Sequence, residues 1–491
     1  MRRAPLVALL CSAALTACGS TVQLAPTAPG AAAAAGSSGG DLSIPLPASP
    51  GLTVAPSRSR EPSQALGGDG PTTLPTARHS SGNGSTTAPD TSVPLTKAGS
   101  GSGPVRVGVL YVGGATALAN SLGIKGLSTG DPAAQSKAIA NYINAHGGLA
   151  GRKISLFYGV INASAAASNV ESAYGAACAK LVQDDKVTYV VSYVNLTAAR
   201  LACYAKKGVT VIDDQSGIPD TTGGANANTF AAPGELALGR AAGALVDDLW
   251  RRGWLTSKSK VGIFTWDSPD GHLFASRYLI PALARHGLQP AAAAFVSNSG
   301  SAANQGGTVL KFRSSGVDRV IPIAASPLFL MESAQTQGYY PAYAVTSTWG
   351  PGALIESAAP KQQLRNAAGI GWDKYLDIGA GKMPPAVSSN ETLCFRIMKA
   401  AGQGSSDTTV KTFQTALCNV MLFLQAASDK FGLGPGTLQL ARQAGFVFPP
   451  ADAFAIKMAV GRFDGVGAYR DIAYQTGCSC FQYTSGNRAV G

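Results

Sequence analysis

The stretch between residues 105 and 158 constrains the fold of this chain most, because it has the pattern of a complete strand–helix–strand unit. An apolar, valine-rich run at 105–111 is typical of a buried parallel strand. Asp131 is a favourable N-cap, and Pro132 is a favourable first residue for the helix that follows. Two glycines at 147–148 then favour its C-terminal end, before a second strand. Such a crossover unit predicts an open α/β sheet.

The same alternation continues along the chain and predicts an α/β protein with doubly wound parallel sheets. We expect further strands at 187–192, 209–212, 260–265, 290–296, 318–323 and 342–346. Helices are expected at 163–183, 197–206, 235–250, 274–286, 303–314 and 328–337. Later in the chain we expect helices at 390–401 and 410–430, and a closing hairpin made of 461–465 and 471–474.

The amino-acid sequence of this opening unit also resembles that of a known family. The phrase INAHGGLAGRKI at residues 143–154, after the strand VRVGVLY, is similar to the opening of type I periplasmic binding proteins. The resemblance is to leucine/isoleucine/valine-binding proteins and their branched-chain and amide-binding relatives, which are substrate receptors of ABC importers. It extends more loosely over residues 104–491.

That resemblance implies two doubly wound parallel-sheet lobes, joined by a three-segment hinge, that close around a small solute. Lobe 1 would comprise residues 104–231 with 370–458, and lobe 2 would comprise 232–369 with 459–491. The segment 230–233 is expected to be one of the crossings between them.

The first 103 residues predict export and tethering. Residues 1–18 combine a basic start with an apolar stretch too short to span a membrane, which is typical of a signal peptide. The sequence Leu-Thr-Ala-Cys ending at Cys18 resembles a bacterial lipobox, so we expect Cys18 to carry lipid. The alternative is an ordinary secretory signal. Residues 19–103 contain 62 Gly, Ala, Ser, Thr or Pro among 85 and no aromatic residue, which predicts a disordered linker.

The cysteines favour disulfides in an exported protein. Of eight Cys, one leaves with the signal and Cys18 is the lipid site, which leaves six. Nearness in the chain favours the pairs Cys178–Cys203, Cys394–Cys418 and Cys478–Cys480. Zinc is disfavoured because the last pair is separated by a single residue.

The formal net charge of +12 does not predict a nucleic-acid partner. Its basic residues are scattered, with no run longer than a pair, whereas nucleic-acid binding needs a clustered footprint. No nucleophile elbow, phosphate loop or dinucleotide fingerprint is present. His272, which lies near Asp267 in the sequence, is a weak candidate for catalysis. Its spacing from Asp267 does not predict a catalytic triad. We therefore expect no enzyme activity, no metal and no cofactor.

Binding is better supported, because ligands of open α/β sheets sit beyond the carboxyl ends of the strands. The candidate ligand-binding residues at these ends are Tyr111, Gly113, Asn195, Thr197, Gln215, Ser216, Trp266, Asp267, Ser326 and Trp349. In the resembled family a Ser/Thr-rich turn after the second strand repeat binds the amino-acid carboxylate. Here that turn is Ser-Tyr-Val-Asn-Leu at 192–196, which departs from the family's Gly and Ser run.

Each candidate also has a structural interpretation. Asn195 or Thr197 is equally well explained as a helix cap. Tyr111 and Trp266 are equally well explained as core aromatics. The neighbouring pair at 213–214, two aspartates, is better explained as a solvated turn.

The sequence thus predicts an extracytoplasmic solute-binding lipoprotein. It would capture a small molecule, such as an amino acid or amide, and deliver it to ABC permease subunits. We expect a monomer anchored by lipid to the outer face of a bacterial cell membrane. The alternatives are a ligand-sensing receptor on the same fold, which signals to a membrane partner, and an exported hydrolase.

Overall fold

A computed structural model gives the structure of the protein. It describes residues 103–117, 128–194, 196–214, 217–218, 220, 226, 228–296, 302–323, 325–356, 359–378 and 383–491. The predicted signal peptide, Cys18 and almost all of the predicted linker lie outside these residues.

The first sheet is parallel throughout and is built from early parts of the chain. As far as the structure describes it, the strand order is β2-β1-β3-β4-β5. Its strands are β1 (Val105–Gly113), β2 (Ile154–Asn162), β3 (Tyr189–Ser192), β4 (Thr210–Asp213) and β5 (Phe230–Ala231). Val107, Val109 and Val190 are fully buried, as expected when helices cover both faces of a parallel sheet.

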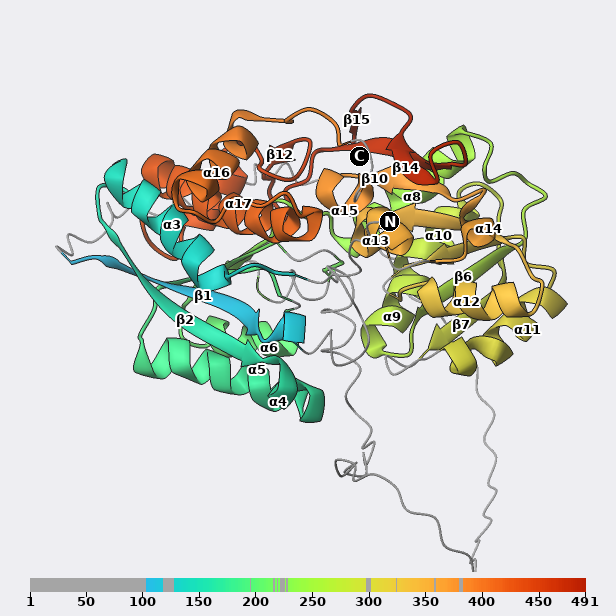
Figure 1. Cartoon of the computed structure of the whole chain (residues 1–491), viewed down its shortest axis with the longest axis horizontal. Helices are drawn as coiled ribbons and strands as arrows, with labels where there is room; N and C mark the ends of the chain where they lie inside the picture. Colours follow the sequence, from blue (N-terminus) through green and yellow to red (C-terminus); the bar gives the residue numbers. More distant parts are fainter. Residues whose placement is uncertain are drawn as a thin grey trace, which may run out of the picture. The chain divides into compact units, whose positions relative to one another are not determined.

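Helices from both ends of the described chain cover this sheet (Figure 1). On one side lie α3 (Pro132–Ala145), α16 (Ser389–Ala400) and α17 (Thr408–Phe431), with α18 (Thr437–Gln443) against α17. On the other lie α4 (Ala163–Ser168), α5 (Val170–Ala179) and α6 (Ala198–Ala205), with the π-helical η1 (Lys180–Asp184) continuing α5. Helices α16 and α17, which come late in the chain, therefore pack on the same side of the first sheet as α3.

The expectation of one continuous helix over 163–183 is wrong. Asn169 has an extended backbone, with φ −154° and ψ 95°, and it separates α4 from α5. Its side chain accepts a hydrogen bond from the Ser172 amide, at 3.0 Å. Asn169 is thus the N-cap of α5, a role in which Asn is favoured over the helix interior.

The second sheet repeats the strand order of the first. Its parallel strands are β6 (Val261–Trp266), β7 (Pro290–Val296), β8 (Arg319–Pro322), β9 (Ala342–Thr346) and β10 (Ala368–Gly371). They lie in the order β7-β6-β8-β9-β10, which matches β2-β1-β3-β4-β5 position by position. The predicted fold, two doubly wound parallel-sheet lobes, is confirmed.

The helices and short segments that accompany the second sheet follow the predicted alternation. They are α8 (Leu238–Arg251), α9 (Pro269–Phe274), η2 (Ala275–Leu279), α10 (Ile280–Ala284), η3 (Ala302–Gln305), α11 (Gly306–Ser314), α12 (Leu328–Thr336), η4 (Ser347–Trp349), α13 (Pro351–Glu356) and α14 (Lys361–Leu364). The helix expected from residue 274 begins earlier, at Pro269, because Ser268 caps it by accepting from the Gly271 amide.

The closing hairpin differs from the expected one. It consists of β13 (Ala468–Gln475) and β14 (Cys480–Tyr483), which extend the second sheet in antiparallel fashion beside β10. Residues 461–465 form no strand of this hairpin; they belong to a chain crossing. The short β15 (Arg488–Ala489) also pairs with β13, and β11 (Val447–Phe448) pairs with β12 (Ile456–Lys457).

Three chain segments run between the two sheets, and backbone hydrogen bonds tie the first of them to the third. The first follows β5, the second follows β10, and the third precedes β13. The Ala232 amide donates to the Phe463 carbonyl at 2.8 Å, and the Ala232 carbonyl accepts from the Gly465 amide at 3.1 Å. The buried Asp464 carboxylate accepts from the Ala237 amide at 2.9 Å and from the Arg240 guanidinium at 2.6 Å. The second crossing leads through α15 (Lys374–Ile378).

The predicted disulfide pairs are present. Cys178 of α5 is bonded to Cys203 of α6, and Cys394 of α16 is bonded to Cys418 of α17. Cys478 and Cys480 are bonded in the turn between β13 and β14. The first bridge joins two neighbouring helices on one face of the first sheet, and the second joins two on the other face. Each bridge restricts the separation of its two helices.

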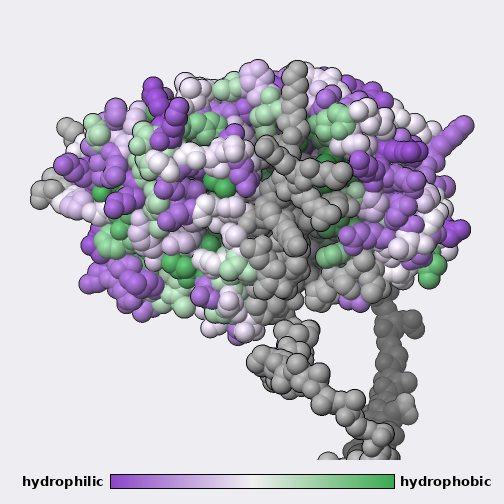
Figure 2. Space-filling view, in the orientation of Figure 1, coloured by the Kyte–Doolittle hydropathy of each residue, from purple (hydrophilic) through white to green (hydrophobic). Residues whose placement is uncertain are grey.

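Figure 2 shows hydrophilic residues over much of the face in view, with apolar residues scattered between them. Among the described residues, no helix combines the length and the apolar character that crossing a membrane requires.

We expect the hydrogen bonds of the Asp464 carboxylate to contribute strongly to the stability of the paired crossing segments. Replacing Asp464 with Asn would leave the half-buried Arg240 without its anion, and we expect the free energy of unfolding to fall by about 3 kcal/mol. Urea denaturation followed by circular dichroism measures this. The matched control is Asp247→Asn, which breaks the surface pairs of Asp247 with Arg285 and His286 and should cost under about 1 kcal/mol. Equal effects of the two substitutions would contradict the assignment.

Candidate functional site

The crossing segments lie at the carboxyl ends of the central strands, where ligands of α/β sheets bind. In the first sheet, Asp214 directly follows β4, and its carboxylate approaches Gly234 of the first crossing. In the second sheet, Ser347 directly follows β9, and its hydroxyl accepts from the Trp372 and Asp373 amides of the second crossing, at 2.7 and 3.2 Å. The strand ends of both lobes are therefore joined to the hinge.

Five buried carboxyl groups meet at these crossings, and we call them the hinge acid cluster: Asp213, Asp214, Glu235, Asp373 and Asp452. Two come from the end of β4, one from the first crossing, one from the second, and one from the loop between β11 and β12. The backbone of Asp373 forms a β-bridge with Ala453, which brings the last two together.

A glycine makes the close approach within this cluster possible. A Cβ atom on Gly234 would lie 2.2 Å from the Asp214 Oδ1 atom and 2.4 Å from the Asn419 amide nitrogen. Any larger residue would displace one of these groups. Asn419, from α17, also accepts from the Ala451 amide at 3.1 Å, so it holds the loop that carries Asp452.

Burial and mutual repulsion raise the pKa values of the cluster. The pKa of Asp214 is raised by burial and then by the negative charge of Asp452. The pKa of Glu235 is raised by burial and then by Asp373, and that of Asp373 by burial and then by Asp452. Burial also raises the pKa of Asp452 to about 6. Burial and repulsion therefore favour the protonated forms of Asp214, Glu235 and Asp373, in which a carboxyl group donates as well as accepts hydrogen bonds.

A sixth buried carboxyl group, Asp377 of α15, stands on the second-sheet side of the hinge. It accepts a hydrogen bond from the Tyr483 hydroxyl at 2.6 Å. Burial raises its pKa to about 8, although hydrogen bonds from Tyr483 and Ser347 oppose that shift. Gly371 permits this position, because a Cβ atom there would lie 2.1 Å from the Asp377 Oδ2 atom.

One buried cation balances an acid at the second crossing. The Lys374 ammonium lies 2.5 Å from the Glu391 carboxylate, and both side chains are almost fully buried. The Tyr375 hydroxyl donates to the same carboxylate at 2.6 Å, and the Val387 amide does so at 2.7 Å. A buried ion pair needs such additional donors, and here they fix the second crossing to α16 of the first lobe.

Two of the predicted ligand residues lie at the end of β1. Tyr111 is half-buried, and its ring meets the Tyr158 ring edge-on, with centroids 6.2 Å apart. Burial, followed by the charge of Asp131, raises the Tyr111 pKa. Gly113 lies beside Val160 of β2, whose methyl group would be 2.5 Å from an added Cβ atom. Both residues are at the predicted edge, and their contact with a solute stays a prediction.

Trp266 and Asp267 end β6 in the second lobe. Trp266 is half-buried and packs against the apolar cores of the protein, so it combines a structural role with a position at the strand end. Asp267 is exposed and pairs with His272, with 2.8 Å between Oδ1 and Nε2. The His272 ring stacks on Phe295, with centroids 3.8 Å apart.

Two other predicted residues act as caps. The Thr197 hydroxyl accepts from the Arg200 amide at 3.4 Å and begins α6. The Ser326 hydroxyl accepts from the Leu328 amide at 3.4 Å at the start of α12. The capping interpretation of Thr197 is thus confirmed. Trp349 lies in η4 after β9, and Asn195, Gln215 and Ser216 lie outside the described residues.

The hinge acid cluster is the feature that reasoning from sequence missed. The expectation that Asp213 and Asp214 form a solvated turn is wrong, because both are buried and face carboxyl groups from distant parts of the chain. The one local signal of their burial was their position directly after the apolar run at 209–212. Nothing local marks Glu235, Asp373 or Asp452 as their neighbours.

The catalytic candidate named from the sequence, His272 near Asp267, is a hydrogen-bonded pair within the described part of the chain. No hydroxyl or thiol group there hydrogen-bonds to the His272 ring, so a His–Asp pair stands without a nucleophile. No group of three His, Cys, Asp or Glu side chains among the described residues is arranged to hold a metal ion.

Comparisons with known proteins support the fold. No protein-family model matches the chain, and no curated protein matches it significantly. Among solved structures it is similar to a solute-binding protein of an ABC transporter from Rhodopseudomonas palustris HaA2 in complex with p-hydroxybenzoic acid. The identity is 12%, the match covers 79% of this chain and 97% of that one, and the TM-score is 0.57.

Two further structures have the same architecture. One is a branched-chain amino acid ABC transporter protein from Thermus thermophilus with bound valine, at 13% identity, 79% and 97% coverage and a TM-score of 0.56. The other is an ABC transporter substrate-binding protein from Desulfitobacterium hafniense in complex with leucine, at 15% identity, 77% and 99% coverage and a TM-score of 0.52. These neighbours are transport binding proteins.

The raised pKa of Asp377 predicts a pH-dependent stability. The folded protein keeps this carboxyl protonated up to about pH 8, whereas the unfolded chain releases the proton near the ordinary aspartate pKa of 3.8. Stability should therefore fall as the pH rises through that interval. In Asp377→Asn, whose amide mimics the protonated acid, we expect a smaller fall between pH 5 and pH 8 in urea denaturation. The exposed Asp267→Asn should keep the full dependence, and a full dependence in Asp377→Asn would contradict the prediction.

Proposed function

We propose that this protein, which has the fold of type I periplasmic binding proteins, is an extracytoplasmic solute-binding protein of an ABC importer. It captures a small molecule between its two lobes and presents the closed form to permease subunits. No bond is made or broken in this process. The lobe limits given by the sequence, 104–231 with 370–458 and 232–369 with 459–491, are part of this proposal.

The single observation that carries the proposal is the repeated strand order with three crossings between the repeats. Two sheets of the same order place their ligand-binding edges at the same chain crossings. A hinge of this kind permits closure around a ligand by small backbone rotations in a few residues. The bonds between Ala232, Phe463 and Gly465 keep two of the crossings together, so they would move as one unit.

The solute proposed here is small, with an apolar body and a polar end, such as an amino acid or an amide. Half-buried aromatic rings at the ends of β1 and β6, those of Tyr111 and Trp266, supply apolar surface. The hinge acid cluster, in which burial raises the pKa values of Asp214, Glu235 and Asp373, supplies hydrogen-bond donors and acceptors. The protein acts as a monomer, without a cofactor, and nucleic acid is not its partner.

Binding through the second-lobe edge can be tested with one substitution. Native mass spectrometry of the purified protein should first show a co-purified small molecule, which calorimetry then titrates. We expect Trp266→Ala to weaken its affinity at least tenfold, because a buried aromatic contact is lost. Trp254→Ala, in the turn that precedes β6 at the opposite end of the strand, should leave the affinity unchanged. An unchanged affinity in Trp266→Ala would count against this site. So would the failure of every amino acid and amide tested to bind the protein.

Membrane attachment through Cys18 is a separate part of the proposal. A lipidated chain should fractionate with membranes and show the mass of a diacylglycerol group on Cys18. Cys18→Ser should release the protein from the membrane fraction, whereas Cys11→Ser, a change within the signal peptide, should not. If Cys18→Ser stays with the membranes, the anchor lies elsewhere.

A further inference from the structure

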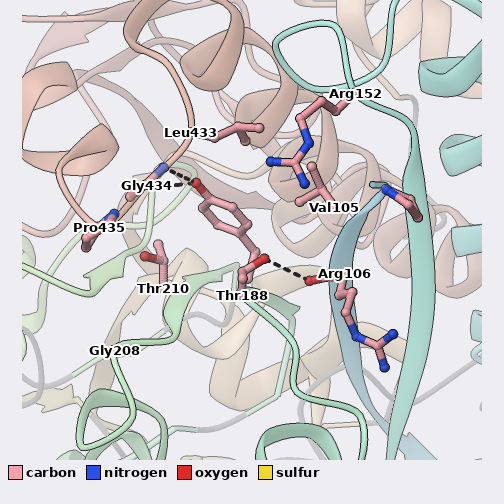
Figure 3. A pocket seen from close by; sticks show the side chains of 11 residues that line it. Val105, Arg106, Arg152, Thr188, Gly208, Thr210, Leu433, Gly434 and Pro435 are labelled. Atoms are coloured by element: carbon pink, nitrogen blue, oxygen red, sulfur yellow. Dashed lines mark hydrogen bonds between the residues drawn. The ribbon is translucent and has the colours of Figure 1, made fainter. Parts of the chain in front are cut away.

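A pocket of about 330 Å³ lies at the opposite edge of the first sheet from the candidate site. It opens at the amino ends of β1, β3 and β4, where Val105, Tyr189 and Thr210 line it (Figure 3). The connection between α17 and α18 closes it with residues 433–435. Strand β1 has nine residues, so about 26 Å separates this amino-edge pocket from the ligand edge.

One guanidinium group faces into the amino-edge pocket. Figure 3 shows the Arg152 side chain beside Val105 and Leu433, pointing inward, whereas the Arg106 side chain points away. The Arg152 Nε and Nη2 atoms donate to the Gly103 carbonyl at 2.9 and 2.7 Å. These bonds hold the group in place, and among the described residues its Nη1 atom has no acceptor and no carboxylate pairs with it.

The two arginines at this edge therefore differ. Arg106 donates to the Asp185 carbonyl at 2.6 Å and stacks on the Phe157 ring at 4.0 Å, so its guanidinium is already engaged. The positive charge of Arg152 instead reaches the Tyr189 phenol: burial raises the pKa of Tyr189, and the Gly434 backbone and Arg152 lower it.

A second polar group, the Thr210 hydroxyl, lines the pocket. Thr210 is 2% exposed, and its hydroxyl makes no hydrogen bond to any residue that the structure describes. The Tyr189 hydroxyl, by contrast, accepts from the Gly434 amide at 2.7 Å. The Thr210 hydroxyl is therefore available to a ligand or to water in the pocket.

The remaining walls are apolar. Val105, Leu433 and Pro435 contribute aliphatic surface, and Tyr189 contributes an aromatic ring. The volume is at the lower end of the range for small-molecule sites, about 300–1,000 Å³. A rigid cation, a free hydroxyl and an apolar wall are together complementary to a small organic anion.

We propose that the amino-edge pocket binds a small monocarboxylate with an apolar body. The carboxylate would accept from the free Arg152 N–H groups, and the body would lie against Val105, Leu433 and Pro435. A guanidinium held in a fixed orientation favours a carboxylate over a neutral group of the same shape. This site is separate from the interlobe solute site and does not depend on it.

Ligand-observed ¹⁹F NMR of the purified protein with 4-fluorobenzoate tests the proposal, with 4-fluorobenzamide as the neutral comparison. We expect the carboxylate to bind at least tenfold more tightly than the amide. Arg152→Gln should weaken carboxylate binding at least tenfold. Thr210→Val, which keeps the side-chain shape on the other side of the Tyr189 ring, should have a smaller effect than Arg152→Gln. Lys153→Gln removes an equal charge from the neighbouring exposed position and should have no effect.

Three outcomes would overturn the proposal. The first is binding that survives Arg152→Gln, which would place the fluorobenzoate at the interlobe site or elsewhere. The second is equal loss in Arg152→Gln and Lys153→Gln, which would indicate general electrostatic attraction only. The third is no binding of 4-fluorobenzoate to the unmodified protein. Circular dichroism of each variant confirms that the chain is folded.

Discussion

The Asp464 carboxylate is the interaction on which the hinge depends. It lies in the third crossing and accepts hydrogen bonds from the first, at the Ala237 amide and the Arg240 guanidinium. Around it, Ala232 exchanges backbone hydrogen bonds with Phe463 and Gly465, as a strand would. Buried backbone groups need such partners, and two crossings that lie outside both sheets supply them to each other. Two of the segments that join the lobes are thus hydrogen-bonded to each other and are not independent loops.

The meeting of the crossing segments also explains the hinge acid cluster. The crossings meet at the carboxyl ends of β4 and β10, and each brings an acidic side chain into a region without water-exposed surface. Lys374 neutralises Glu391, but among the described residues no lysine or arginine forms an ion pair with Asp214, Glu235, Asp373 or Asp452. Protonation lowers their electrostatic free energy, because burying several ionised carboxylates is costly, and backbone amides stabilise those of Asp373 and Asp452 by donating to them. The candidate solute site therefore adjoins a set of groups that donate and accept hydrogen bonds.

The two edges of the first sheet have different chemistry. The carboxyl edge carries acids and joins the hinge, and the amino edge carries the uncompensated guanidinium of Arg152. Both follow from the parallel arrangement, which collects all strand beginnings at one edge and all strand ends at the other. A parallel sheet can therefore present two chemically distinct sites whose occupancies need not compete.

Local sequence signals predicted most elements and failed at identifiable places. Strands β7 and β9 have the predicted limits because apolar runs and turn residues bound them clearly. The helix over 163–183 was interrupted because Asn169 satisfies a helix end better than a helix interior. Residues 461–465 have the composition of a turn and strand, yet Ala232, far away in the chain, determines their pairing.

The resemblance of the sequence to a known family implied the two lobes, and the residues themselves determined the alternation of strands and helices, the three disulfide pairs and the strand ends that carry Tyr111 and Trp266. These follow from periodicity, caps and proximity in the chain, all of which are local. Only the tertiary structure decided which acids meet at the hinge, because Asp373 and Asp452 lie more than a hundred residues after Asp214 and Glu235 in the chain. It likewise decided that Arg152 faces a cavity while Arg106 is engaged elsewhere, since the direction of a side chain depends on the elements packed around it.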